Sequence, residues 1–276
     1  DQYCNCNEVP QQCYNTCPEG YYQTPDCGCA SIPNSNPPGT CTLVACSTSG
    51  YVVDRNLCKC VLSKNDPDST PDPCAGKISK NYLLNVADEN NVLAGNILAV
   101  YNVETGGQAF TSDGTPKVLF ERHHFSKLTN HIYDNSNPNI SGPKRVRYGS
   151  YSDNLIYLKE AFALNPVAAI KSASFGAFQI LGSNYQLAGY SNMDDFYNDM
   201  ISTNADTHLE AFIQYVINRG ILDDLQNENW DGFAKGYNGQ YYNSPGSASK
   251  DYDKKMKSES DKYKNNSDLI NNEDCF

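Results

Sequence analysis

The cysteines of this chain are concentrated at one end, and they limit how each part can fold. Eleven of the twelve lie in residues 1–74, and the remaining one is Cys275. A short segment with this cysteine density is typical of disulfide-stapled folds, whereas the rest of the chain must rely on a buried core. The sequence therefore predicts a cysteine-rich module over residues 1–62 and a larger domain over residues 74–276, joined by a proline-bearing linker over residues 63–73.

The spacing of the N-terminal cysteines favours disulfides over zinc. Several pairs, such as Cys27 and Cys29, have one residue between them, whereas structural zinc sites usually have two to four, and no histidine precedes His123. Disulfides indicate an oxidising compartment, so we expect a secreted protein or one of the lysosomal or phagosomal lumen. One spacing pattern occurs twice, which indicates two short repeats: Cys13, Cys17, Cys27, Cys29 and Cys41, Cys46, Cys58, Cys60.

Charge and hydropathy exclude several kinds of partner. The formal net charge is −11, and the only local basic cluster is Lys144, Arg145 and Arg147, so we expect no nucleic-acid partner. No apolar stretch is long enough to span a bilayer, so no membrane partner is expected either, and the chain is expected to be a monomer. The start at Asp1 without an apolar leader indicates that a signal peptide has been removed. Two triplets fit glycosylation acceptors, beginning at Asn139 and Asn265.

Helical periodicity dominates from Ile78 onward. One helix is expected to end just after Glu104, because Gly106-Gly107 follows it. Residues 110–120 contain an Asp113-Gly114 turn and an alternating segment, which predict a short β-hairpin. Further helices are expected over residues 155–164, 167–172, 193–201, 207–219, 230–236 and 251–263. The larger domain is thus predicted to be α+β and mostly α.

Cys74 opens the larger domain and Cys275 nearly closes it. We expect the two to pair, closing a loop whose length corresponds to about 4–5 kcal/mol of stabilisation in the chain-entropy model. In the alternative, Cys74 belongs to the N-terminal disulfide framework, and Cys275 is left free or forms an intermolecular bond.

Glu104 is the strongest candidate for a catalytic residue. It falls at helical spacing from Ile97, Val100 and Tyr101, which directs its carboxyl group along an apolar stripe toward the interior. Partial burial disfavours the ionised carboxylate and raises its pKa, as a general acid requires. The following Gly106-Gly107 leaves room for a substrate beside the carboxyl group. The alternative interpretation is an exposed glutamate near a helix end.

Four motifs, the first of which contains Glu104, follow one another along the chain. They are Val103-Glu104-Thr105-Gly106-Gly107, the run from Asp113-Gly114 to Leu119-Phe120-Glu121-Arg122-His123-His124-Phe125, the segment Ser172–Ile180 and the segment Phe233–Gly239. Together they resemble the N-acetylmuramidase family of bacteriophage endolysins and some secreted eukaryotic lysozymes, and more distantly goose-type lysozymes and lytic transglycosylases. The resemblance runs from about residue 78 to about residue 263. It implies a lysozyme-like fold and cleavage of the β-1,4 bond between N-acetylmuramic acid and N-acetylglucosamine.

The resemblance also implies roles for individual residues. Glu104 becomes the proton donor. Gln179, with the backbone of Phe178-Gln179-Ile180, would line the sugar-binding cleft, and Tyr237 and Asn238 would contact the sugar next to the scissile bond.

Glu121 is harder to assign. If the strand continues, Glu121 shares a face with Leu119 and His123 and points into the cleft, where a second carboxylate could activate water or stabilise positive charge on the sugar, and where His123 could contact substrate. The alternative is an ion pair of Glu121 with Arg122 that braces the hairpin. Asp113 is a further candidate for substrate contact, although a turn-forming role is favoured.

The predicted function is a secreted muramidase, an antibacterial or digestive lysozyme whose partner is bacterial peptidoglycan. One alternative is a lytic transglycosylase, in which the same glutamate acts as acid and then base and yields an anhydro product. Another is a cysteine-rich carbohydrate-binding or protease-inhibitor protein with an inactive lysozyme-like domain. No His-Glu-x-x-His or Gly-x-Ser-x-Gly motif occurs, so neither a metal or other cofactor nor a serine nucleophile is expected.

Overall fold

In the computed structural model, the described residues are 74–276 apart from Asp113, Val146, Arg147, Thr203 and Ala248, together with the backbone of four short N-terminal strands. The chain forms two compact units, and the larger one consists of Pro71–Ala163 and Val167–Phe276. The predicted linker over residues 63–73 lies outside the described residues, as does most of the predicted module over residues 1–62. Among the described helices, none combines the length and the apolar character needed to cross a membrane.

The four N-terminal strands form two antiparallel pairs. Strand β1 (Tyr21–Gln23) pairs with β2 (Cys29–Ser31), and β3 (Tyr51–Asp54) pairs with β4 (Lys59–Leu62). Each predicted repeat therefore contains one hairpin, and the last cysteine of the repeat lies in its second strand.

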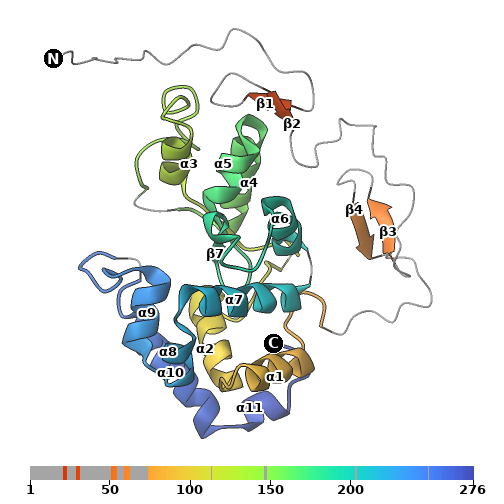
Figure 1. The fold of residues 1–276 in the computed structure, drawn as a ribbon, viewed down its shortest axis with the longest axis vertical. Helices are drawn as coiled ribbons and strands as arrows, with labels where there is room; N and C mark the ends of the chain where they lie inside the picture. The colour runs from red at the N-terminus through yellow and green to blue at the C-terminus, as the bar shows by residue number, and fades with distance from the viewer. Residues whose placement is uncertain are drawn as a thin grey trace, which may run out of the picture. The chain divides into compact units, whose positions relative to one another are not determined.

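The larger unit is mostly helical, as predicted, and Figure 1 shows its helices. Apolar residues at helical spacing explain the long ones: the α7 helix buries Leu209, Phe212, Ile213 and Val216 on one stripe. The described helices are α1 (Lys80–Glu89), α2 (Ala94–Thr105), α3 (Arg122–Leu128), α4 (Tyr151–Leu164), α5 (Pro166–Lys171), the short 3₁₀ helix η1 (Gly182–Asn184), α6 (Met193–Ile201), α7 (Ala205–Arg219), α8 (Leu222–Gln226), α9 (Trp230–Asn238), α10 (Tyr252–Asn265) and α11 (Asp268–Asn271).

A small antiparallel sheet completes the unit. Its strand order is β5-β6-β7, with β5 at Val118–Phe120, β6 at Ala173–Phe175 and β7 at Ile180–Leu181. The α+β prediction is confirmed, and the predicted hairpin within residues 110–120 forms in part, because the backbone N–H groups of Thr111 and Lys117 donate to the carbonyl oxygens of Thr115 and Ala109 over 2.8 and 3.0 Å. Only one bridge joins Phe110 to Pro116, and β5 pairs with β6 instead, because that pairing buries Val118 and Phe120 in the core.

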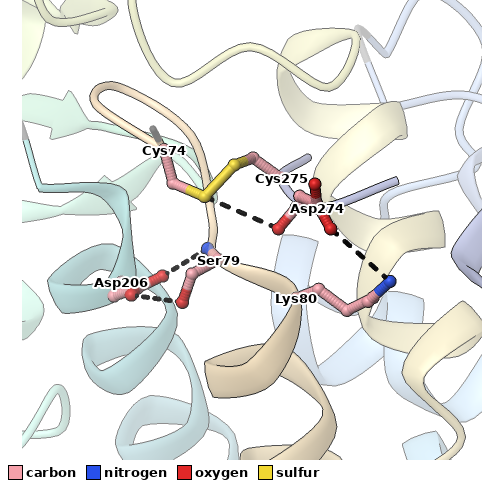
Figure 2. The surroundings of a disulfide bond; sticks show 6 residues. All are labelled: Cys74, Ser79, Lys80, Asp206, Asp274 and Cys275. Atoms are coloured by element: carbon pink, nitrogen blue, oxygen red, sulfur yellow. Dashed lines mark hydrogen bonds and ion pairs between the residues drawn. A yellow bond between two sulfur atoms is a disulfide. The ribbon is translucent and has the colours of Figure 1, made fainter. Parts of the chain in front are cut away.

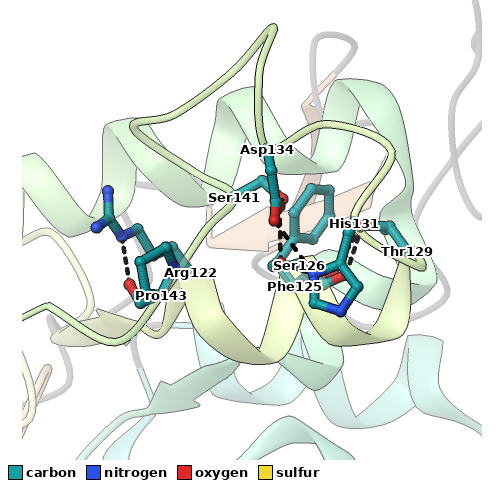
Figure 3. Close-up of polar contacts among 8 residues, drawn as sticks. All are labelled: Arg122, Phe125, Ser126, Thr129, His131, Asp134, Ser141 and Pro143. Atoms are coloured by element: carbon teal, nitrogen blue, oxygen red, sulfur yellow. Dashed lines mark hydrogen bonds and ion pairs between the residues drawn. The ribbon is translucent and has the colours of Figure 1, made fainter.

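The strand also ends earlier than predicted. Glu121 is the N-cap residue of α3, and the His124 backbone N–H donates to the Glu121 carbonyl oxygen over 2.9 Å, so the chain turns into a helix where we expected a strand. The prediction that Glu121 shares a strand face with Leu119 and His123 is therefore wrong. Arg122 donates to the carbonyl oxygen of Pro143 over 2.8 Å (Figure 3) and to that of Pro138 over 2.6 Å, and these two bonds hold the following loop.

Helices α2 and α10 pack closely against each other. Gly95 permits this approach, since a Cβ atom at that position would lie 2.6 Å from Cβ of Tyr263. The buried Asn96 accepts a hydrogen bond from Ser260 over 2.7 Å, and Asn102 donates to the Tyr263 hydroxyl over 2.8 Å. Buried polar contacts of this kind specify one register between two helices. They fix where the first residue of α10 lies relative to the C-terminal end of α2.

A disulfide joins the two ends of the larger unit. Cys74 and Cys275 are bonded, with their Cα atoms 5.3 Å apart (Figure 2), as predicted. Beside it, Ser79 donates to Asp206 through both its backbone N–H and its hydroxyl, each over 2.8 Å. The alternative that leaves Cys275 unpaired in this domain is therefore wrong.

Candidate active site

Glu104 lies in the last turn of α2. The helix ends at Gly106, whose φ of 68° places it in the left-handed region that glycine tolerates. A side chain at Gly106 would meet open space, whereas one at Gly107 would lie 2.6 Å from Asn102 Oδ1. Beyond this turn, a hollow in the surface is lined by Gly107, Phe110 and residues 75–77. The turn therefore combines close packing on one side with open space on the other.

The Glu104 carboxyl group is enclosed by protein although the residue as a whole is half-buried. Burial raises its pKa from 4.5 to about 7, and a hydrogen bond donated by the Tyr252 hydroxyl to Oε1 offsets part of that rise. Desolvation disfavours the charged carboxylate, while the hydrogen bond favours it. The balance leaves Glu104 protonated below neutral pH, which is the state a proton donor needs.

Two tyrosines, Tyr252 and Tyr237, lie close to this carboxyl group. The Tyr237 ring lies parallel to that of Tyr252, with centroids 6.4 Å apart, and stacks on Phe233 with centroids 5.3 Å apart. Burial, and after it the charge of Glu104, raises the pKa of both tyrosines well above 10. Both hydroxyl groups therefore stay protonated and act as donors. Tyr237 donates to the Phe178 carbonyl oxygen over 2.6 Å.

The segment from Gly176 to Gln179 lies against the end of α2. Gln179 has a φ of 50°, and its Nε2 donates to the carbonyl oxygens of Gly176, over 2.9 Å, and Lys117, over 3.2 Å. Thr105 donates to the Ala177 carbonyl oxygen over 3.0 Å. The residue that follows Glu104 is thus bonded directly to the predicted sugar-binding segment.

Lys117 also contacts the C-terminal end of α2. Its side chain is buried, and Nζ donates to the Thr105 carbonyl oxygen over 2.7 Å. Burial lowers the pKa of this amine. The amine also lies 5.1 Å from the ring centroid of Tyr151, whose own pKa is raised by burial and by the charge of Glu104. Lys117 belongs to one of the quoted motifs, but no sequence pattern places it beside Glu104.

His208 also contacts the segment from Gly176 to Gln179. It is buried, and its Nδ1 accepts a hydrogen bond from the Ala177 backbone N–H over 3.2 Å. Burial lowers its pKa to about 4, despite the nearby backbone carbonyl groups of α6, so the ring is neutral near pH 7. Its ring stacks on Phe110, and a Cβ atom at Gly176 would lie 2.7 Å from Nδ1. The ring therefore fits only because residue 176 is glycine.

Phe178 and Asn238, two predicted substrate-binding residues, differ in exposure. The Phe178 ring is buried and stacks on Phe212, with centroids 4.2 Å apart, so only its backbone can line a cleft. Asn238 is exposed at the end of α9, where it accepts from Ser249 over 3.2 Å, and a hydrogen bond from its side chain lowers the pKa of Tyr252. Asp113 lies outside the described residues.

Glu121 lies at the opposite end of β5 from Lys117. Four residues of strand correspond to about 13 Å. Its Oε2 accepts a hydrogen bond from the Tyr148 hydroxyl over 3.1 Å and lies 3.8 Å from His123 Nδ1. Among the described residues, no hydrogen bond or ion pair links Glu121 to Glu104. The structure thus brings His123 to Glu121, and the catalytic role of Glu121 stays a prediction.

Ser126, His131 and Asp134 lie together but do not form a nucleophilic site. Ser126 is buried and donates to Asp134 over 2.7 Å, and Ser141 donates to the same carboxylate (Figure 3). These hydrogen bonds, first from Ser141 and then from Ser126, lower the pKa of Asp134. The Ser126 hydroxyl also lies 2.8 Å from His131 Nδ1, and that same nitrogen lies 3.1 Å from Asp134, so one ring nitrogen meets both partners and the group anchors a loop.

These features define a class of protein. The helix α2 ends at a carboxyl group whose pKa burial raises to about 7, close to Tyr252 and beside a small antiparallel sheet, and an acid of this kind suits a glycoside hydrolase. The family model of the N-acetylmuramidases matches residues 94–264. The chain therefore belongs to the N-acetylmuramidase family, and it is a muramidase that cleaves peptidoglycan.

A solved structure agrees with this assignment. The crystal structure of a Burkholderia AP3 phage endolysin is similar to this chain, with 29% sequence identity and a TM-score of 0.59, and the match covers 70% of this chain and 72% of the endolysin. No protein with a curated description matches. The predicted resemblance is confirmed, and the family match includes Glu104, Gln179, Tyr237 and Tyr252 but none of residues 1–73.

Sequence reasoning missed Tyr252 and His208 as parts of this site. Tyr252 lies 148 residues from Glu104 along the chain, and His208 lies 31 residues from Ala177. Both are single residues outside the quoted motifs, so only their spatial position reveals them.

Proposed function

We propose that this protein is a secreted lysozyme that hydrolyses the β-1,4 bond between N-acetylmuramic acid and N-acetylglucosamine in bacterial peptidoglycan. The observation that carries the proposal is the position of Glu104 at the end of α2, where it accepts a hydrogen bond from Tyr252 and where burial raises its pKa to about 7. A carboxylic acid that retains its proton near neutral pH can give it to the departing sugar oxygen.

Tyr252 takes part on the product side of that step. When Glu104 gives up its proton, a carboxylate is left in an enclosed site, and the Tyr252 hydroxyl donates a hydrogen bond to it. A bond to the charged form lowers the cost of proton transfer. The pKa of Tyr252 is raised well above 10, so this hydroxyl supplies a hydrogen bond and keeps its own proton.

Gln179 and Asn238 are the candidates for sugar contact. The nitrogen of the Gln179 amide is bound to two carbonyl groups of the protein, so its oxygen is the end that would accept from a sugar hydroxyl or acetamido N–H. Asn238 is exposed beside Tyr237 at the end of α9. Each position follows the residue roles of the family resemblance, with Phe178 contributing its backbone alone.

The experiment is digestion of purified peptidoglycan with mass spectrometry of the fragments. Wild-type protein should release fragments with a reducing N-acetylmuramic acid end, and Glu104→Gln should release them at least about a hundredfold more slowly. Glu160→Gln, a change at an exposed glutamate of α4, is the matched control and should cleave normally. Anhydro ends would make the protein a lytic transglycosylase, and a reducing N-acetylglucosamine end would contradict the proposed bond. Absence of any fragment would indicate an inactive domain.

Secretion is supported by two features. The described domain holds a disulfide between Cys74 and Cys275, which persists in oxidising compartments, and both predicted glycosylation acceptors, Asn139 and Asn265, are exposed. Expression behind a signal peptide in a eukaryotic host should deliver the protein to the medium with glycans that endoglycosidase removes. Retention inside the cell without glycans would contradict this part of the proposal.

A further inference from the structure

Three potential metal ligands meet where β5 passes into α3. Glu121, His123 and His124 each offer one ligand atom, and these atoms all lie within 4.8 Å of one another. The distances are 3.8 Å from Glu121 Oε2 to His123 Nδ1 and 4.0 Å from Glu121 Oε1 to His124 Nε2. Ligands of a tetrahedral zinc ion lie about 3.4 Å from each other, given zinc–ligand bonds of about 2.1 Å. Small side-chain rotations would therefore close the site.

One ligand atom of the cluster lacks the contact that burial normally demands. His123 Nδ1 is buried, and no described residue forms a hydrogen bond with it. Such a nitrogen is costly to bury without a partner. A bound metal ion would supply the missing partner.

The surroundings hold the cluster in place while leaving it open. Tyr148 donates to Glu121 Oε2 over 3.1 Å, which is the kind of outer contact that orients a metal-binding carboxylate. The exposed side-chain fractions are 18% for Glu121, 28% for His123 and 39% for His124, so an ion can enter from solvent. The two imidazole rings lie with centroids 4.2 Å apart and an interplanar angle of 38°.

The ligand set selects the kind of ion. Two imidazole nitrogens and one carboxylate suit zinc and the neighbouring late transition metals, whereas calcium and magnesium prefer oxygen ligands alone. The nearby Lys144, whose charge lowers the pKa of His123, opposes a cation and limits the affinity. With three protein ligands, at least one coordination position stays open to water or another group.

We propose that Glu121, His123 and His124 form a binding site for a divalent transition-metal ion such as Zn²⁺. This site was not expected from the sequence, which lacks a helical His-Glu-x-x-His motif. The ion would tie the end of β5 to the first turn of α3. The proposal does not depend on the muramidase reaction, because it concerns binding alone.

The test measures Zn²⁺ binding to the full chain, without an affinity tag, by competition with a chromogenic chelator. Wild-type protein should bind one Zn²⁺ that is lost, or held at least about tenfold more weakly, in His123→Gln and in His124→Gln. His131→Gln is the matched control, because His131 follows the same helix but pairs with Asp134. It should bind Zn²⁺ as the wild type does.

A second measurement on wild-type protein keeps the test independent of how the variants fold. Co²⁺ bound at this site should give visible absorption bands of nitrogen and oxygen ligation without the near-ultraviolet charge-transfer band of thiolate ligands. A thiolate band would mean that cysteines hold the ion and would overturn the proposal. Equal Zn²⁺ affinity in wild type and in the folded His123→Gln, His124→Gln double variant would also overturn it, as would no binding by the wild type.

Discussion

Replacing Glu104 with glutamine should stabilise this protein while lowering its activity at least about a hundredfold. The enclosed carboxyl group is ionised at alkaline pH in a site that disfavours charge, so the folded state bears a cost that the unfolded chain does not. Glutamine has nearly the same shape and never ionises. Its side-chain oxygen can still accept the hydrogen bond from Tyr252, which donates to Glu104 in the wild type.

The magnitude follows from the pKa of Glu104. Burial raises it from 4.5 to about 7, and each unit corresponds to about 1.4 kcal/mol, so the total is about 3 kcal/mol. Below pH 4.5 both folded and unfolded states are protonated, and the carboxyl group costs nothing. As the pH rises toward 7, the unfolded state ionises first and the wild type loses stability. Above pH 7 both states are ionised, and the loss levels off.

The assay is urea unfolding of wild type and Glu104→Gln at a series of pH values from 4 to 8.5. The difference in unfolding free energy should be small at pH 4 and should grow to about 3 kcal/mol in favour of the variant above pH 7. Glu160→Gln controls for the loss of one carboxyl group at an exposed site. A difference that does not change with pH, or one that favours the wild type at pH 8, would refute the assignment of an enclosed, high-pKa acid.

Three further substitutions test the hydrogen bond from Tyr252, the disulfide and the packing of α2 against α10. Tyr252→Phe removes a hydrogen bond that stabilises the charged form of Glu104, so the pKa of Glu104 should rise. The alkaline limb of the kcat/KM profile on a soluble substrate, expected near pH 7 in the wild type, should therefore move up by about one to two pH units. An unchanged limb would contradict this. Replacing both Cys74 and Cys275 with serine should lower the unfolding free energy by about 4–5 kcal/mol in denaturant titrations, and an unchanged midpoint would show that the cross-link contributes little. Gly95→Ala places a methyl group against Tyr263 and should cost about 1–3 kcal/mol, seen as a lower Tm with the disulfide intact.

Features that depend on local pattern were predictable from the sequence. The helix carrying Glu104 was recognisable because its apolar residues recur at helical spacing and Gly106-Gly107 ends it, and α6 was predicted with the bounds that the structure shows, Met193–Ile201. The disulfide was predictable because Cys275 is the only cysteine after Cys74. The helices could be predicted from the spacing of neighbouring residues, and the disulfide from the number of cysteines.

Features that depend on distant parts of the chain were not predictable. The alternation in residues 117–120 indicated a strand, but its partner β6 lies more than fifty residues away, and no turn signal announces such a pairing. Glu121 was misplaced because a strand pattern was extended through a residue that starts a helix. The environment of Glu104 shows the same limit: burial could be inferred from periodicity, whereas the hydroxyl group of Tyr252 that moderates its pKa could not.

The covalent link between Cys74 and Cys275 makes the catalytic domain a closed ring of chain. The Cα atoms of the two cysteines are 5.3 Å apart although their separation in sequence is 201. A protease that cuts one peptide bond inside the ring opens it without releasing any fragment, so the two pieces stay tethered and the packed helices can hold them in place. Two cuts are needed before material is lost.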